Sequence, residues 1–245
     1  MAANDDYPSA PGDRRAAVRL RGAGRRKPSS ARWLARQLND PYVAAARRLG
    51  YRSRAAFKLV ELDRRFHLLR RGQRVADLGC APGGWTQVAL ARVGRSGTVV
   101  GVDLGETAPL SGARLLRADI RDHGAAAAIE AALGGPADVV LCDLAPAATG
   151  HAATDHLRSL ALAEAGFAVA SAILGAGGSF VAKLRQGGTE SELIEALKLS
   201  FTELRQAKPL ASRAESAETY FVARGFRPGP ETRRAPSGEA GIGDL

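Results

Sequence analysis

The sequence predicts an α/β fold, with a mainly parallel sheet and helices on both of its faces. From residue 73 onward, short apolar runs alternate with segments of helical periodicity, which is typical of a parallel sheet. The 245 residues suffice for one such domain with appendages and a sizeable core. Ligands bind at the carboxyl ends of the strands in such sheets, and Gly79, Asp103, Asp119 and Asp143 fall at these ends.

The strands and helices of this alternating part can be assigned in order along the chain. Strands are expected at residues 75–78, 98–102, 114–116, 138–142, 179–184, 204–207 and 219–223. Helices are expected between them, at residues 84–93, 125–133, 154–174 and 190–199.

Two helices are expected ahead of the first strand, within residues 33–69. Asp40-Pro41 indicates the start of one, with Asp40 as the N-cap, and Gly50 indicates its end. Ser53 is predicted to cap the next helix. That helix has a buried stripe at helical spacing, formed by Ala56, Leu59, Val60, Leu62 and Phe66.

The charge of the chain is concentrated at its N-terminus. The net charge is +10, and residues 1–58 carry 14 Lys/Arg against 4 Asp/Glu, whereas residues 59–245 carry 21 of each. Residues 1–30 are predicted to be a disordered basic arm, residues 31–225 a folded domain that includes the N-terminal helices, and residues 226–245 a flexible tail. A basic arm ahead of a neutral domain suits a nucleic acid, and the alternative is a solvated Arg-rich tail without a partner.

Composition excludes several classes of protein. The two cysteines, Cys80 and Cys142, give no disulfide framework and are expected to be buried, so a reducing cytoplasm is the expected location. No apolar run has the length of a membrane span. The four histidines lack the spacing of a metal site, and none is expected. A monomer is expected.

A glycine-rich loop, Asp77-Leu-Gly-Cys-Ala-Pro-Gly-Gly-Trp-Thr86, follows the first strand. Its glycines let the chain turn sharply and let a ligand approach the backbone. It is neither a dinucleotide fingerprint nor a Walker loop. Asp103, at the end of the second strand, can accept hydrogen bonds from ribose hydroxyls, and its charge disfavours a ribose phosphate. The loop therefore suits a phosphate-free nucleoside such as S-adenosylmethionine, and the alternative is an ordinary strand–helix turn.

Four charged residues are candidates for proton transfer: Lys58, Asp143, Lys183 and Glu218. A hydroxyl is a poor nucleophile until its proton begins to leave, and only a neutral lysine can take that proton. A second lysine nearby, or partial burial, is expected to lower a lysine pKa from about 10.4 to about 7–8. Lys183 is an isolated cation in an apolar strand, where an unpartnered charge is costly.

Each of these four residues also has an ordinary explanation. Lys58 fits a lysine on a helix surface and Asp143 a turn-capping residue. Lys183 fits a strand-end lysine whose ammonium group reaches solvent, and Glu218 a charge on an edge strand. Spacing alone does not join the four into one site.

From Ser30 to Gly225 the chain resembles the FtsJ/RlmE family of ribosomal RNA 2′-O-methyltransferases. The segments that carry the resemblance are Ser30-Ala-Arg-Trp-Leu34, Asp40-Pro-Tyr-Val43, Arg52-Ser-Arg-Ala-Ala-Phe-Lys-Leu59, Asp77–Gln87, Asp143-Leu-Ala-Pro146, Gly177-Gly-Ser-Phe-Val-Ala-Lys183 and Ser212–Val222. The resemblance implies a Rossmann-like S-adenosylmethionine-dependent methyltransferase fold with a seven-stranded sheet.

The resemblance also implies site residues. It places a Lys-Asp-Lys-Glu tetrad at Lys58, Asp143, Lys183 and Glu218, with Lys183 as the proton acceptor. Glu218 matches better than Glu215, because Tyr220 two positions on fixes the register. Cofactor contacts are implied at Gly83, Trp85, Asp103, Asp119 and Asp143.

The implied reaction is methyl transfer to the ribose 2′-hydroxyl of a uridine in the A loop of 23S ribosomal RNA. The partner is then the 50S subunit, contacted by the basic N-terminal segment. Two alternatives stay open: the same chemistry on another RNA, such as a transfer RNA or a messenger cap, and an RNA-binding ribosome-assembly factor. One departure lies after Pro146, where Ala147 and Ala148 stand at a place at which the family often has Asn.

Overall fold

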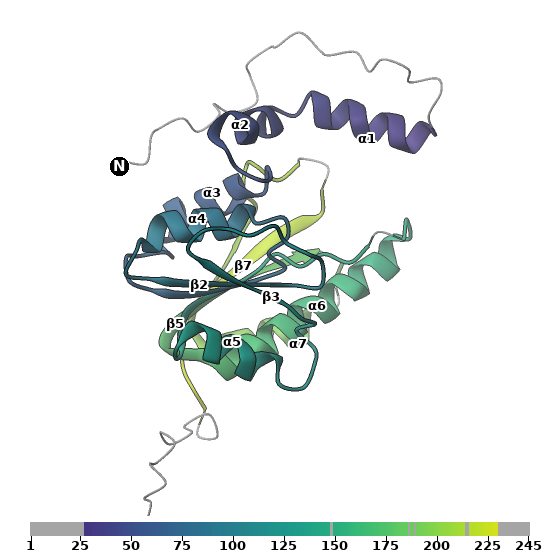
Figure 1. The fold of residues 1–245 in the computed structure, drawn as a ribbon. Coiled ribbons are helices and arrows are strands. Elements are labelled where there is room, and N and C mark those ends of the chain that lie inside the picture. Colours follow the sequence, from purple (N-terminus) through teal and green to yellow (C-terminus); the bar gives the residue numbers. More distant parts are fainter. Residues whose placement is uncertain (1–26, 148, 186, 189, 214–215, 230–245) are drawn as a thin grey trace, which may run out of the picture.

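One sheet of seven strands forms the centre of the molecule. The computed structural model describes residues 27–229, except 148, 186, 189, 214 and 215 (Figure 1). The strands lie in the order β3-β2-β1-β4-β5-β7-β6, and β7 runs antiparallel to both of its neighbours. Their bounds are β1 Arg74–Leu78, β2 Thr98–Asp103, β3 Ala113–Arg117, β4 Ala137–Cys142, β5 Leu174–Arg185, β6 Phe201–Ala207 and β7 Glu218–Phe226. The predicted mainly parallel seven-stranded sheet is confirmed.

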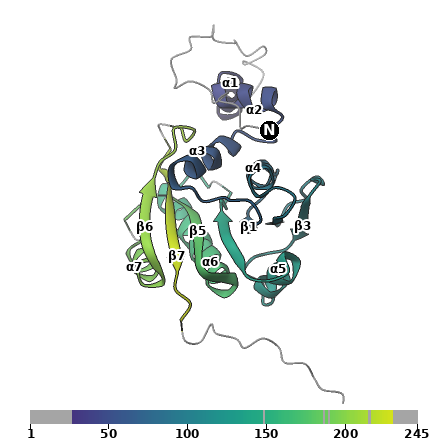
Figure 2. The ribbon, with the colours of Figure 1, turned by 90° about the vertical axis from the view of Figure 1, so that its left-hand side faces the viewer.

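Helices cover both faces of the sheet, as Figures 1 and 2 show. Helices α3 and α4 pack on one face, and α5, α6 and α7 pack on the other, while α1 and α2 lie beyond α3. Their bounds are α1 Pro28–Leu38, α2 Pro41–Leu49, α3 Ala56–Phe66, α4 Gly84–Val93, α5 Ala125–Leu133, α6 Ala152–Ile173 and α7 Ser191–Ser200. No helix in the described ranges has both the length and the apolar character that a membrane crossing requires.

The inner strands are apolar on both sides because each side faces a separate core. In β1, Val75 contributes to the core beneath α3 and α4, whereas Ala76 and Leu78 contribute to the core beneath α5 and α6. In β4, Val139 and Leu141 lie in the first core, and Val140 and Cys142 lie in the second. Strands buried on both faces lack polar alternation, which explains why the sequence shows continuous apolar runs.

The caps of α2 are those that the sequence indicates. The Asp40 carboxylate accepts a hydrogen bond from the Tyr42 N–H at 3.0 Å, Pro41 occupies the first turn, and Gly50 ends the helix with φ of 75°. Tyr42 and Phe57 then share a small core with Ala211, which holds α2 against α3 and against the segment ahead of β7.

The predicted Ser53 cap of α3 is wrong. The N-cap is Ala55, without a side-chain hydrogen bond, because residues 53–55 already form a turn whose carbonyls accept from the N–H groups of residues 56–58. The Ser53 hydroxyl lies instead close to Gly84, where an added Cβ would meet it at 2.3 Å. Ser53 therefore packs α3 onto the start of α4.

The larger differences from the predicted boundaries lie in α1, β5, β6 and β7; strand β6 begins at Phe201, three residues before its predicted start. Helix α1 begins at Pro28, inside the segment predicted to be a disordered arm, and β5 begins at Leu174, directly after α6. Strand β7 continues to Phe226, one residue into the predicted tail. The rest of the predicted arm, residues 1–26, and the tail from residue 230 lie outside the described residues.

The turn after β1 depends on Gly79, which has φ of 83°. A Cβ at this position would lie 2.8 Å from Leu144 Cδ2 and 3.0 Å from the Leu144 backbone nitrogen. Backbone cannot yield as a flexible side chain does, so both conformation and space require glycine here.

We expect Gly79→Ala to lower the free energy of unfolding by more than the ~1–2 kcal/mol that a left-handed conformation costs alone. Gly134→Ala is the matched control, because Gly134 has φ of 76° and open space where the Cβ would lie. Urea denaturation of both variants measures the difference, and equal losses would contradict the steric argument.

Candidate active site

The four predicted catalytic residues come together at the carboxyl edge of the sheet. Lys183 lies on β5, Asp143 directly follows β4, Lys58 lies on α3 and Glu218 opens β7. Lys183 Nζ lies 3.0 Å from Asp143 Oδ1 and donates to the Asp143 carbonyl at 2.8 Å. Lys58 Nζ lies 3.1 Å from Glu218 Oε2. Both lysines are 7% exposed, so neither is a surface lysine.

Tyr220 joins the two ion pairs, and sequence reasoning used it only to set the register of Glu218. Its hydroxyl donates to Asp143 Oδ1 at 2.8 Å, the same oxygen that Lys183 contacts. Lys58 Nζ lies 5.6 Å from the centre of the Tyr220 ring, within range of a cation–π contact. Tyr220 is opposite Lys183 in the β5–β7 register. The signal that the sequence did carry is a tyrosine at the start of the apolar run Tyr220-Phe-Val-Ala223.

The electrostatics differ from the prediction at Lys183. Burial is the largest influence and lowers the pKa of Lys183, but the Asp143 and Glu218 carboxylates outweigh it and hold the pKa above its ordinary value. The expectation that a neighbouring lysine lowers this pKa is therefore wrong. The reason is that each lysine arrives with a carboxylate, so Lys183 is surrounded by opposite charge.

The carboxylates show the reciprocal effect. Burial raises the pKa of Asp143, yet Lys183, Lys58 and the Tyr220 hydroxyl together hold it below its ordinary value. The pKa of Glu218 is likewise lowered, because Lys58 and Lys183 outweigh burial. In the resting state the four residues are thus two cations and two anions. Such a cluster can orient a hydroxyl group and stabilise charge that develops on it.

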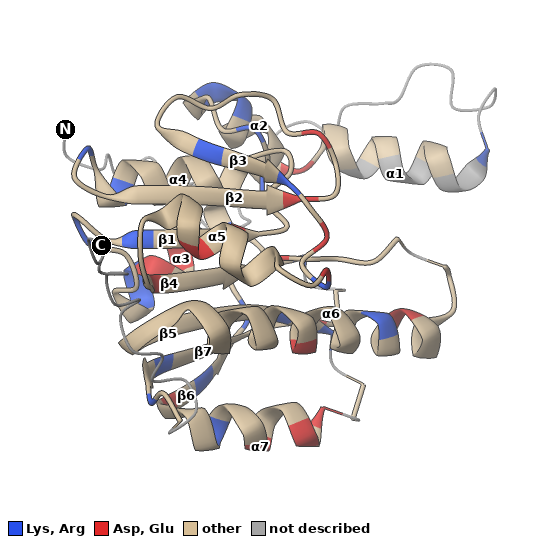
Figure 3. Ribbon diagram, turned by 60° about the horizontal axis from the view of Figure 1, so that its bottom comes forward, with Lys and Arg blue, Asp and Glu red and all other residues tan. Residues whose placement is uncertain are grey.

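A cavity of about 610 Å³ adjoins this tetrad at the ends of β1, β2 and β4. Its lining includes Gly79, Asp103, Asp143, Leu144 and Arg158. Acidic segments gather at this edge of the sheet, as the red stretches at and beyond the tip of β2 show in Figure 3. The volume lies in the usual range for small-molecule and cofactor sites.

Asp103 and Gly83 shape the loops around this cavity. The Asp103 carboxylate accepts from the Ala81 N–H at 3.0 Å and from the Gly105 N–H at 2.8 Å, and its remaining lone pairs can accept ribose hydroxyls. Gly83 has φ of 111°, and an added Cβ would meet Arg52 Nη1 at 2.9 Å. Arg52, which the sequence analysis did not single out, donates to the carbonyls of Pro82, Ala108 and Pro109. It therefore connects the loop that follows β1 with the loop that follows β2.

The side chains of Trp85 and Asp119, two predicted cofactor contacts, each have partners within the protein. The Trp85 side chain is 3% exposed, donates to the Ala55 carbonyl at 2.8 Å and packs 5.7 Å from the Tyr220 ring. Its side chain is part of the core beneath α3 and α4. Asp119 is bound by Arg121 through its guanidinium group and backbone N–H, which lowers the pKa of Asp119 to about 2.

The comparisons with known proteins agree with this geometry. Residues 51–226 match the sequence model of a family described as FtsJ-like methyltransferase. The chain belongs to the FtsJ-like methyltransferase family. The matched segment contains all four members of the tetrad.

Two relatives in this family are each named ribosomal RNA large subunit methyltransferase E. The one from Acidiphilium cryptum is 56% identical over 215 residues, which cover 88% of this chain and 95% of that protein. The one from Paramagnetospirillum magneticum is 56% identical over 221 residues, covering 88% and 91%. Among solved structures, a ribosomal RNA methyltransferase from Plasmodium falciparum has a TM-score of 0.64 and 27% identity, and covers 72% of this chain and 98% of its own.

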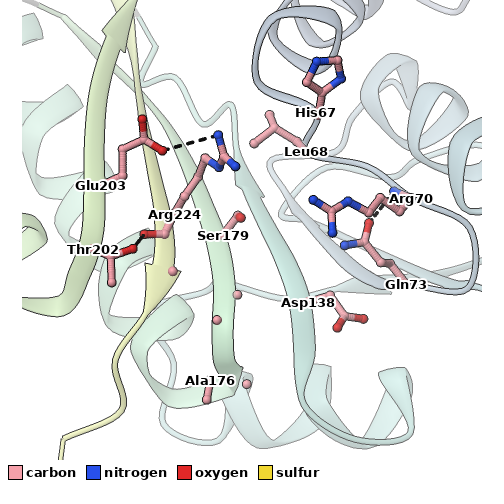
Figure 4. Close-up of a pocket in the computed structure, with 14 residues that line it drawn as sticks. His67, Leu68, Arg70, Gln73, Asp138, Ala176, Ser179, Thr202, Glu203 and Arg224 are labelled. Atoms are coloured by element: carbon pink, nitrogen blue, oxygen red, sulfur yellow. Dashed lines mark hydrogen bonds and ion pairs between the residues drawn. The ribbon is translucent and has the colours of Figure 1, made fainter.

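A second cavity of this FtsJ-like methyltransferase lies at the opposite edge of the sheet (Figure 4). Its volume is about 380 Å³, and its lining mixes Arg70 and Arg224 with Asp138 and Glu203. Arg224 pairs with Glu203 at 3.4 Å, and no predicted site residue lines this cavity. Its charges are therefore mutually balanced at the end of the sheet away from the tetrad.

Asp77, at the base of the glycine-rich loop, is buried with 0% exposure and accepts from the Thr86 hydroxyl at 2.7 Å. Burial is the main cause that raises the pKa of Asp77 from 3.8 to about 7. The Thr86 hydrogen bond opposes this effect, while Asp143 and Asp103 raise the pKa further.

The cysteines are buried as predicted, and burial raises the pKa of Cys80 to about 11 and of Cys142 to about 12.

We expect Asp77 to make the protein less stable as the pH rises from about 4 to about 7. The folded state holds this proton more tightly than the unfolded state, so the stabilisation is complete below pH 3.8 and is lost as the pH rises through the folded pKa of about 7. Asp77→Asn cannot titrate, so its free energy of unfolding relative to the wild type should increase across this window. Urea titrations at several pH values measure it, and a constant difference would contradict the raised pKa.

Proposed function

We propose that this protein methylates the ribose 2′-hydroxyl of a uridine in the A loop of 23S ribosomal RNA, with S-adenosylmethionine as the methyl donor. The buried Lys183–Asp143 pair beside the 610 Å³ cavity is the observation that carries the proposal. The names of the two relatives support ribosomal RNA of the large subunit as the substrate. Their high identity over most of both chains supports the same activity in this protein.

The residues of the cavity fit the proposed cofactor. Asp103 offers acceptors for ribose hydroxyls, Gly79 brings the backbone close, and the exposed Leu104 gives an apolar wall for a base. S-adenosylmethionine has no phosphate groups, so its binding needs no phosphate-binding loop. The acidic residues at this edge of the sheet in Figure 3 would disfavour a phosphate. When bound, S-adenosylmethionine supplies an electrophilic methyl group on a sulfonium. Its positive charge is compatible with Asp103 and Asp143.

The tetrad residues have distinct proposed roles. Lys183 accepts the proton of the 2′-hydroxyl after losing its own proton to solvent. Asp143 fixes the Lys183 amine in place and favours the ammonium that forms again as the proton transfers. The ion pair with Glu218 fixes the position of Lys58, whose ammonium group places a second positive charge near the reacting oxygen. Most of the rate acceleration then comes from alignment of the reacting atoms.

The partner is proposed to be the 50S subunit, which the basic N-terminal segment contacts in the cytoplasm, where ribosomes assemble. Residues 1–58 hold the whole excess positive charge of the chain, which suits binding to phosphates. The protein is proposed to act as a monomer, since the tetrad and the cavity are built within one chain.

Transfer of radiolabelled methyl from S-adenosylmethionine to 50S subunits that lack the modification tests the function. We expect the wild type to label a uridine 2′-oxygen and Lys183→Ala to lose at least about a hundredfold in kcat, as loss of a general base does. Lys198→Ala is the control, because Lys198 is exposed on α7 and pairs with Glu195, far from the tetrad. No labelling of subunits by the wild type would refute the substrate, and labelling of transfer RNA instead would favour the other RNA class.

The raised pKa of Lys183 predicts the pH dependence of the reaction. Because a protonated lysine cannot accept a proton, kcat should rise with pH on the alkaline side of neutrality. Glu218 helps to raise this pKa, so Glu218→Gln should move the rise in kcat to lower pH. Glu195→Gln on α7 should leave it unchanged. An unshifted or upward-shifted profile in Glu218→Gln would contradict the role of Lys183 as the base.

A further inference from the structure

A cavity of about 450 Å³ adjoins the tetrad through Lys58 and Glu218, whereas the cofactor cavity adjoins it through Asp143. Its other lining residues include Gln37 of α1, Arg54, Arg185 and Arg213. A reaction that joins a donor and an acceptor at the tetrad needs room for each of them. The volume is in the range of small-molecule sites and large enough for a nucleotide, so this cavity is a candidate for the acceptor.

The polar groups in this cavity are not all used by the protein itself. Lys58 pairs with Glu218, and Arg54 is held by Asp40 at 2.9 Å and donates to the Ala211 carbonyl. Within residues 27–229, the gaps aside, no hydrogen bond or ion pair involves the Gln37 amide or the Arg185 guanidinium, and the one acid on which Arg185 acts at longer range is Asp155, whose pKa it helps to lower. Both groups are half-buried and line the same cavity, so their hydrogen-bonding capacity is available to a polar ligand there.

Arg185 lines this cavity close to the tetrad. It is two residues beyond Lys183 on β5, so the two side chains project from the same face of the strand. It is also opposite Glu218 in the β5–β7 register. Arg213 adds positive charge, with only a 3.8 Å contact to Asp40, an acid that already binds Arg54. A guanidinium matches phosphate oxygens in a bidentate manner.

We propose that this cavity holds the acceptor nucleotide of the RNA, with the Gln37 amide hydrogen-bonded to the edge of its base and Arg185 bound to its phosphate. The proposal rests on the proposed function. A glutamine amide has both donors and an acceptor, as does the Watson–Crick edge of uracil, so two hydrogen bonds can form at once. Gln37 is thus a positioning residue that sets the base while the tetrad acts on the ribose.

The first test compares the kinetics of Gln37→Leu with those of the wild type on 50S subunits that lack the modification. We expect the KM for subunits to rise by about tenfold, which is the loss of roughly one to two net hydrogen bonds. The kcat and the KM for S-adenosylmethionine should change little, which a general structural defect would not permit. Gln73→Leu is the matched control, because Gln73 lines the cavity of Figure 4 at the other edge of the sheet.

A Gln37→Leu variant with the KM of the wild type overturns the assignment of Gln37, and so does one whose cofactor KM changes equally. If the wild type itself labels no subunits, the proposed function fails, and the two failures are thereby distinguished.

For Arg185, the variant Arg185→Gln should reduce the slope of log KM against log salt concentration by about one. Arg205→Gln, exposed on β6, should not change it, and equal slopes in both variants overturn the phosphate contact.

A second measurement needs neither turnover nor a variant. RNA of the large subunit with 4-thiouridine at the acceptor position is irradiated in complex with the wild-type protein, and the crosslinked peptide is identified by mass spectrometry. We expect a crosslink within α1, at or beside Gln37. Crosslinks confined to the cofactor cavity or to the cavity of Figure 4 would overturn the placement.

Discussion

The ion pair between Lys183 and Asp143 is the interaction on which the rest of the site depends. Both side chains are largely removed from water, where desolvation costs several kcal/mol per ion unless partners compensate it. Compensation comes from three directions: the Asp143 carbonyl, the Tyr220 hydroxyl and the second pair of Lys58 and Glu218. Since these partners come from α3, the end of β4, β5 and β7, the site exists only when the sheet and its first covering helix are assembled.

Much of the fold could be predicted because its signals are local. The N-cap of α2 needs only the side chain of Asp40, and its C-cap needs only the backbone freedom of Gly50. Burial of β1 and β4 on both faces is recognisable in the sequence as continuous apolar runs. The errors occurred where tertiary packing decides. Ser53 has the composition of a cap, yet it packs against Gly84, which is distant in sequence. Strand β5 begins directly after α6 because Leu174 already pairs with Ala137 of β4.

The proximity of Lys58, Asp143, Lys183 and Glu218 was predictable only through the family resemblance, and their electrostatics were not predictable at all. Sequence reasoning from spacing left the four residues separate, and the family resemblance joined them. The sign of the pKa shift at Lys183 depends on distances to Asp143 and Glu218 that no spacing reveals. Trp85 lies in the cofactor motif, yet its side chain serves the core through the Ala55 carbonyl and Tyr220. A motif thus identifies a position, and the fold decides whether backbone or side chain is used there.

In the proposed function, the two cavities beside the tetrad separate the chemistry from the choice of acceptor. The segment that matches the family, residues 51–226, contains the whole tetrad. It also contains every residue that lines the 610 Å³ cavity. The acceptor cavity is completed from outside this segment, by Gln37 of α1. Helix α1 is attached through α2, whose contact with α3 depends on Tyr42 and Phe57. A change in α1 can therefore alter how a base is held while the buried ion pairs stay intact, because no member of the tetrad needs α1 for its own hydrogen bonds.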